Sequence, residues 1–118
     1  MIEFVLVGTG GALGAILRYG IGRTFDNATF PWSVFVVNVI GSSFLGFLLF
    51  GPVPSEMVLL FGVGFCGAFT TFSSFSYQTV MLAENQSWGM AAVHAFGTLL
   101  VAMVGFLMGA ALGGLFGI

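Results

Sequence analysis

Gly67-Ala68-Phe69-Thr70-Thr71-Phe72-Ser73-Ser74-Phe75-Ser76 is the stretch of this chain that combines hydroxyl groups with phenyl rings. It lies within a longer segment, Met57 to Ala83, that contains no Asp, Glu, Lys or Arg. A helix needs about 20 apolar residues to cross a bilayer, so the longer segment is predicted to span a membrane. Polar groups are costly in hydrocarbon unless protein, water or an ion satisfies them. We therefore expect function to depend on the stretch from Gly67 to Ser76.

The rest of the chain has the composition of an integral membrane protein. Of its 118 residues, 58% are hydrophobic and 5% are charged, and the mean hydropathy is +1.14. In soluble domains roughly a quarter of the residues are charged. We predict an all-α membrane protein with one domain, residues 1–118, whose four transmembrane helices cover roughly residues 2–22, 31–51, 57–83 and 87–117. The net charge of −2 gives no reason to expect a nucleic-acid partner.

The first span is predicted to be a retained helix rather than a signal peptide. Glu3 stands where a signal peptide carries positive charge, and Arg18 comes where its apolar stretch would end. Arg18 and Arg23 are the only basic residues, and the Lys/Arg bias of short loops sets orientation in the membrane. Because two arginines give only a weak bias, the chain can insert into the membrane in either orientation. An antiparallel homodimer could then form.

Short polar connections and small residues predict closely packed neighbouring helices. The connections are Asp26–Thr29, Gly51–Ser55 and Glu84–Ser87. Small residues recur at four-residue spacing, which places them on one helix face where backbones can approach closely. These residues are Gly10 and Gly14 in the first span, Ser42 and Gly46 in the second, and Gly105, Gly109, Gly113 and Gly117 in the fourth.

Catalytic function is not predicted. The four carboxylates, Glu3, Asp26, Glu56 and Glu84, lie at predicted helix ends or in loops. His94 is the only histidine, and no Cys, His, Asp or Glu residues have the spacing of metal ligands.

Two polar residues in the first and second spans have alternative interpretations. Asn38 lies near the middle of its span, where an amide either joins helices or faces a pore. Arg18 cannot be neutralised, so its guanidinium either reaches water at the membrane surface or attracts an anion at a vestibule.

The third span contains a sequence that is unfavourable for a helix. Gly67 and the consecutive Thr70 and Thr71 are poor helix formers. If the helix unwinds there, its carbonyl groups need a partner, and a cation held by backbone oxygens would supply one.

The phenyl rings after this point also allow two interpretations. Phe72 and Phe75 share a helix face, and the positive edges of their rings could line a passage for a small anion. Thr71, Ser73 and Ser74 could donate hydrogen bonds to the same ion. Alternatively, the rings pack in the ordinary way and the hydroxyls bond back to the helix.

In the fourth span His94, Thr98 and Ala102 lie on one helix face, because they are spaced four residues apart. A lone histidine at this place is either structural or functional.

Three motifs together resemble the Fluc (CrcB) family of fluoride channels. They are Gly10-Gly11-Ala12-Leu13-Gly14-Ala15-Ile16-Leu17-Arg18-Tyr19, Val37-Asn38-Val39-Ile40-Gly41-Ser42, and Gly67-Ala68-Phe69-Thr70-Thr71-Phe72-Ser73-Ser74-Phe75. The resemblance implies an antiparallel, dual-topology homodimer of four-helix subunits. Two narrow pores along its interface would export fluoride passively and so lower fluoride toxicity in the cytoplasm.

The resemblance also implies roles for individual residues. Asn38 and the edges of Phe72 and Phe75 would line each pore, and Arg18 would lie near a vestibule. A polar track would draw on Thr71, Ser73 or Ser74 in the third helix and on His94 and Thr98 in the fourth. The carbonyls of Gly67 and Thr70 from both subunits would hold a structural Na⁺ at the break in the third helix.

The chain departs from the family pattern at two places. His94 and Thr98 stand where family members usually have a Tyr or Asn followed by a Ser, and Ser33-Val34 replaces a Gly-Thr pair. A homodimer is expected because the first three motifs are intact, but a heterodimer with an unequal subunit stays open.

Passive export suits a plasma or bacterial inner membrane. A negative-inside potential expels a monovalent anion with about 2.3 kcal/mol per 100 mV, so no energy coupling is needed. The main alternative is a small multidrug transporter, which needs a carboxylate within the membrane in its first helix, and Glu3 is too near the terminus for that. A non-transporting assembly subunit would have packing glycines without a polar track.

Overall fold

The computed structural model describes residues 1–24, 30–85 and 87–117, and in this part of the chain all regular structure is helical. The helices in chain order are α1 (Ile2–Thr24), α2 (Trp32–Phe50), α3 (Ser55–Met57), the π-helix η1 (Val58–Cys66), α4 (Gly67–Phe69), α5 (Phe72–Asn85) and α6 (Trp88–Phe116).

Four helical stretches are long and apolar enough to cross a membrane. They are Ile2–Thr24, Trp32–Phe50, Ser55–Asn85 and Trp88–Phe116. The predicted all-α fold with four spans is therefore confirmed, and each predicted span boundary agrees within two residues. The connection predicted at Asp26–Thr29 lies outside the described residues.

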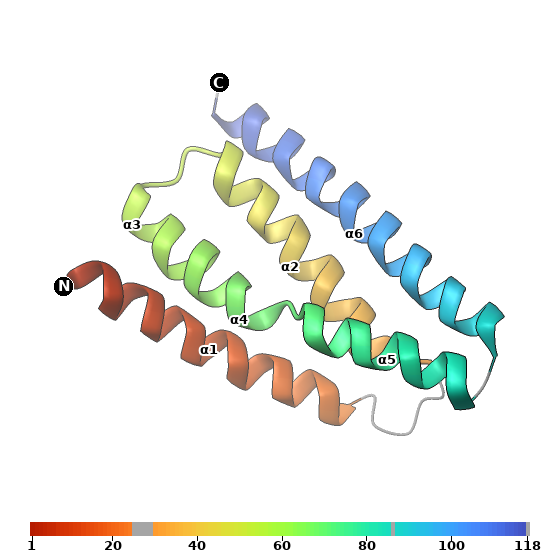
Figure 1. The fold of residues 1–118 in the computed structure, drawn as a ribbon. Helices are drawn as coiled ribbons and strands as arrows, with labels where there is room; N and C mark the ends of the chain where they lie inside the picture. The colour runs from red at the N-terminus through yellow and green to blue at the C-terminus, as the bar shows by residue number, and fades with distance from the viewer. Residues whose placement is uncertain (25–29, 86, 118) are drawn as a thin grey trace.

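The four spans lie side by side in a thin slab measuring 45 × 30 × 20 Å (Figure 1). α2 packs mainly against α6, α1 packs against η1 and α4, and α5 packs against α6. Because a slab of this thickness has little interior, buried apolar side chains such as Val37, Phe69 and Leu82 are few. Large hydrophobic side chains are exposed along every span, as expected for surfaces that face lipid or another protein.

Two glycine seams set the spacing between the helices. A Cβ atom at Gly14 of α1 would overlap the Phe65 carbonyl group, and one at Gly109 of α6 would overlap the Ser43 carbonyl group of α2. These close approaches confirm the predicted seams at both residues. Ser42 differs from the prediction, because it lines two cavities and is only half-buried.

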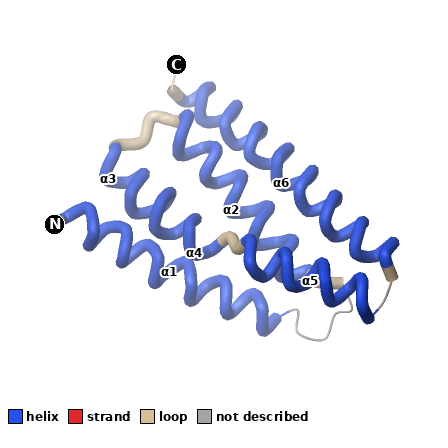
Figure 2. The backbone as a smooth tube through the Cα atoms, in the orientation of Figure 1, coloured by secondary structure: helices blue, strands red, loops and turns tan. Residues whose placement is uncertain are grey.

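The third span consists of several helical segments. The π-helix η1, which the sequence does not predict, is followed by the single turn α4. Thr70 then has an extended backbone, with φ −78° and ψ 157°, and α5 begins at Phe72. This interruption, visible as the loop between α4 and α5 in Figure 2, is consistent with the expected break.

Candidate functional site

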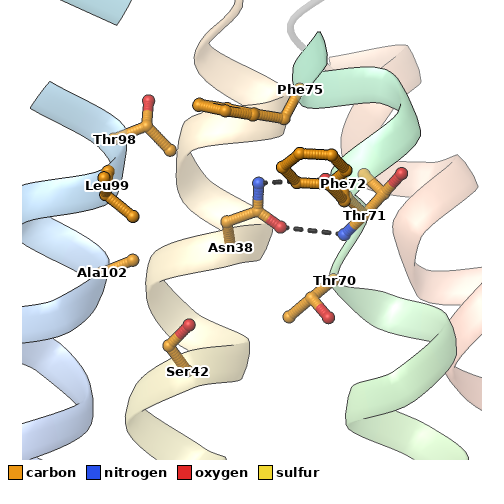
Figure 3. A pocket seen from close by; sticks show the side chains of 9 residues that line it. All are labelled: Asn38, Ser42, Thr70, Thr71, Phe72, Phe75, Thr98, Leu99 and Ala102. Atoms are coloured by element: carbon orange, nitrogen blue, oxygen red, sulfur yellow. Dashed lines mark hydrogen bonds between the residues drawn. The ribbon is translucent and has the colours of Figure 1, made fainter. Parts of the chain in front are cut away.

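The interruption between α4 and α5 is held by one side chain of α2. The Asn38 Nδ2 atom donates a hydrogen bond to the Thr71 carbonyl oxygen at 3.2 Å. The Thr71 N–H donates to Asn38 Oδ1 at 2.8 Å (Figure 3). Asn38 thus satisfies both backbone polar groups of a residue that has left the helix, as a buried backbone requires. Of its two interpretations, the helix-joining amide is the one that this geometry demonstrates directly.

Thr71 also begins the next helix. Its Oγ1 atom accepts a hydrogen bond from the Ser74 N–H at 3.1 Å, which is the bond of an N-cap residue. The Ser73 hydroxyl lies 3.3 Å from the same oxygen. By contrast, the Thr70 hydroxyl bonds back to the Cys66 carbonyl at 2.8 Å. The two adjacent threonines therefore end one helix and start the next.

These bonds leave two carbonyl groups without their usual helical donors. In an α-helix the Gly67 carbonyl would accept from the Thr71 N–H, and the Thr70 carbonyl would accept from the Ser74 N–H. The first N–H donates to Asn38 and the second to the Thr71 hydroxyl. Gly67 is exposed, and nothing lies within 4 Å of the position of a Cβ atom there. Backbone carbonyl oxygens that have lost their helical donors are the type of ligand that a hard cation such as Na⁺ prefers.

A cavity of about 260 Å³ opens beside this interruption, and we call it the Asn38 cavity. Its lining residues come from α2, α5, α6 and the interruption: Asn38, Ser42, Thr70, Thr71, Phe72, Phe75, Thr98, Leu99 and Ala102. The Phe72 and Phe75 rings lie 5.8 Å apart between centroids, with their planes 35° apart. Phe72 is 79% exposed, so the cavity is open on the side where this ring lies.

A second cavity, of about 140 Å³, lies on the other side of Thr71. We call it the Arg18 cavity, and its lining residues are Arg18, Gly22, Ser33, Val34, Val37, Thr71, Ser74 and Gln78. Among the described residues the only ion pair joins the Met1 amino group and Glu3. The positive charge of Arg18 therefore faces hydroxyl and amide groups rather than a carboxylate, and it can attract an anion.

His94 lies behind the Asn38 cavity. Its side chain is 0% exposed and is absent from the cavity lining. The Nε2 atom lies 3.4 Å from the Phe75 carbonyl oxygen, and Nδ1 lies 3.4 Å from Thr98 Oγ1. His94 thus touches two residues that do line the cavity.

The two cavities bring most of the predicted site residues together. Ser73 lies outside both cavities, and Gly67 lies on the exposed surface. Ser42, predicted as a packing residue, lines the Asn38 cavity, and Gln78, which has no predicted role, lines the Arg18 cavity. Each follows a predicted site residue by four positions, Ser42 after Asn38 and Gln78 after Ser74, so helical periodicity could have identified them.

An apolar groove continues from the Asn38 cavity along α6. Its volume is about 320 Å³, and its lining residues are Ser42, Leu99, Ala102, Met103, Phe106 and Leu107. Three of these residues also line the Asn38 cavity, so the two hollows form one continuous surface.

The amino-acid sequence of this chain has relatives among known proteins. The family model described as "CrcB-like protein, Camphor Resistance (CrcB)" matches residues 5–110. A Haloarcula marismortui protein named "Fluoride-specific ion channel FluC 2" is 50% identical over 100 residues, covering 85% of this chain and 84% of the relative. A Thermus thermophilus protein named "Fluoride-specific ion channel FluC" is 43% identical over 123 residues, covering 95% of this chain and 97% of the relative.

Proposed function

The chain belongs to the CrcB-like family, and on that premise we propose that it is a fluoride-specific ion channel of a cell membrane. The relatives are named as ion channels, and the chain is not an enzyme. Its four membrane-spanning helices make it a multi-pass membrane protein. The observation that carries the proposal is the pair of cavities on either side of Thr71, one lined by a guanidinium and the other by an amide and two phenyl rings.

The groups around Thr71 suit a small anion that must give up its water. Fluoride is strongly hydrated, so each lost water needs a replacement donor. In the proposed pathway Arg18 attracts the ion, and the Thr71 and Ser74 hydroxyls and the second Nδ2 hydrogen of Asn38 donate to it. The positive edges of Phe72 and Phe75 then contact the ion. Close-set donors in a narrow passage favour fluoride over the larger chloride ion.

A second copy of the chain would complete the pore. The Asn38 cavity and the apolar groove open to the surface of the slab, and Phe72 at the rim is 79% exposed. An anion in such a cavity would face lipid on one side, which is unfavourable. We propose an antiparallel homodimer, in which the partner closes each cavity and two pores result. The few basic residues support insertion in both orientations.

The carbonyls of Gly67 and Thr70 are the proposed ligands of a structural Na⁺ at the centre of the dimer. Support comes from the diversion of their helical donors to Asn38 and to the Thr71 hydroxyl. The ion would supply the partner that these carbonyl oxygens need, and it would join the interrupted helices of both subunits.

Fluoride efflux from liposomes that contain the purified protein tests this function. The potential is set with a K⁺ ionophore, and efflux is read with a fluoride electrode beside a chloride control. Fast fluoride release without chloride release is expected from a plasma or inner-membrane channel that exports the ion down its electrical gradient. Release that appears only after a related subunit is added would make the channel a heterodimer and overturn the homodimer. Absence of fluoride release from folded, dimeric protein both with and without that subunit would overturn the channel function.

A further inference from the structure

The buried ring of His94 connects the two sides of the Asn38 cavity. Its Nε2 atom lies 3.4 Å from the Phe75 carbonyl oxygen in α5, and its Nδ1 atom lies 3.4 Å from Thr98 Oγ1 in α6. Phe75 and Thr98 both line the cavity. The His94 and Phe75 rings are also in contact, with centroids 5.1 Å apart.

The chemistry of these contacts defines where the hydrogens lie. A backbone carbonyl can only accept, so Nε2 carries a hydrogen and donates to Phe75. In a neutral ring the other nitrogen, Nδ1, is then an acceptor. The Thr98 hydroxyl must therefore donate its single hydrogen to His94, and this hydrogen is not available to an anion in the cavity.

The Thr98 hydroxyl differs in this respect from the Ser43 and Thr79 hydroxyls. Ser43 and Thr79 each bond back to the carbonyl four residues earlier, at 2.8 Å. The Thr98 hydroxyl instead bonds to Nδ1 of the His94 side chain. In Figure 3 the Thr98 oxygen points away from Asn38, and the methyl carbon points toward the cavity. The neutral ring thus keeps a hydrogen-bond donor out of the passage.

Protonation of the ring would reverse this bond. With hydrogens on both nitrogens, Nδ1 donates to Thr98 Oγ1, and the Thr98 hydrogen becomes available to an anion. The positive charge on His94 attracts the same anion. The helices packed against α6 supply few competing charges, because α2 has no titratable side chain and α5 has only Tyr77 and Glu84. The remaining ring in contact with His94, that of Phe30, is uncharged.

We propose that His94 is a proton-operated positioning residue, which determines whether Thr98 offers a hydrogen-bond donor to fluoride in the Asn38 cavity. This inference rests on the proposed fluoride-channel function. Fluoride in the cavity and the proton on His94 favour each other, because linkage between two bound ions is reciprocal. The Thr98 donor also replaces a water that fluoride loses on entering the passage, so we expect fluoride efflux to increase as the solution becomes more acidic.

The first test compares fluoride efflux at two pH values. Histidine takes up protons between pH 5 and 8, so efflux is measured at about pH 5.5 and about pH 7.5. Protein-free liposomes correct for leakage of hydrogen fluoride at each pH. One additional hydrogen bond to a charged ion corresponds to an increase in fluoride efflux of about tenfold at the lower pH. A fluoride-selective efflux that is equal at both pH values overturns the inference but leaves the channel function intact. No fluoride efflux at either pH overturns both.

Variants then separate the proposed switch from a purely structural role. In His94→Gln the amide can still donate to Phe75 and accept from Thr98 but cannot take up a proton, so the ratio of effluxes at the two pH values should fall to about one. Thr98→Val should lower the ratio to the part that the charge of His94 supplies by itself, whereas Thr98→Ser should keep the full ratio. An undiminished ratio in Thr98→Val overturns the hydroxyl mechanism, because the charge of His94 alone would then explain it.

A spectroscopic measurement provides a readout that does not depend on flux. His94 is the only histidine, so ¹⁵N-labelled histidine in protein without an affinity tag reports this ring alone. The neutral ring should carry its hydrogen on Nε2, and addition of fluoride should move its titration to higher pH. A hydrogen on Nδ1, or a titration that fluoride does not change, contradicts the proposal.

Discussion

Asn38 and Thr71 exchange two hydrogen bonds across 33 residues of sequence. The amide donates to the Thr71 carbonyl at 3.2 Å and accepts from the Thr71 N–H at 2.8 Å. Because Thr71 separates the Asn38 cavity from the Arg18 cavity, this contact positions the wall between them. An extended backbone within a membrane span is stable only when protein satisfies it in this way.

Replacement of Asn38 by Ala should therefore affect both stability and transport. Two backbone groups of Thr71 lose their partner, which costs about 1–3 kcal/mol in the free energy of unfolding. Fluoride efflux should fall about tenfold, which corresponds to about 1.4 kcal/mol in the barrier. Thermal unfolding in detergent and liposome efflux measure the two effects. Efflux at the wild-type rate in Asn38→Ala would mean that the amide serves packing alone.

Phe72→Ile and Phe75→Ile should each reduce fluoride efflux about tenfold or more, because an aliphatic side chain has no positive edge. The proposed dimer should remain intact by size-exclusion chromatography. Phe96→Ile is the matched control, since Phe96 is 72% exposed, close to the 79% of Phe72, and lines none of the cavities described above. Undiminished efflux in both pore variants would exclude the ring-edge role.

Arg18→Gln should lower fluoride efflux, and the loss should be larger at low ionic strength. The charge of Arg18 lies in a cavity, and salt screens charges over a Debye length of about 8 Å at physiological ionic strength. The control is Arg23→Gln, because Arg23 is exposed and contacts Tyr19, with 3.2 Å between Nη1 and the hydroxyl oxygen. Equal losses in the two variants would show that only overall charge matters.

Removal of sodium should impair the channel slowly. If Na⁺ holds the Gly67 and Thr70 carbonyls at the dimer centre, exchange for a large organic cation requires the subunits to loosen. Efflux should then decline over prolonged exchange rather than at once. An immediate and reversible dependence of efflux on Na⁺ would instead indicate coupled transport.

Gly109→Ala should destabilise the bundle because its Cβ would overlap the Ser43 carbonyl group. Overpacking of this kind costs about 1–3 kcal/mol in the free energy of unfolding. Gly97→Ala lies on the same helix with nothing within 4 Å of its Cβ position, so it should be tolerated. Thermal unfolding of both variants in detergent measures the difference in stability. Equal stabilities would contradict the close packing of α6 against α2 at Gly109.

The predictability of the site differed from residue to residue. Helical spacing predicted that Thr98 and Ala102 share a face, and both line the Asn38 cavity. The same spacing put His94 on that face, yet its ring is fully buried behind the cavity. The π-helix η1 was not predicted, because its apolar sequence also suits an α-helix. The dimer and the sodium ion stay predictions.

The sequence by itself determined the membrane class, the four spans and the location of the polar run. Hydropathy and charge belong to contiguous residues, so they can be recognised without knowledge of the fold. Only the tertiary structure decided that Asn38 binds Thr71 and that His94 reaches Phe75, 19 residues away. Such pairs depend on how neighbouring helices are rotated and shifted against one another, and close packing at residues such as Gly109 sets that register.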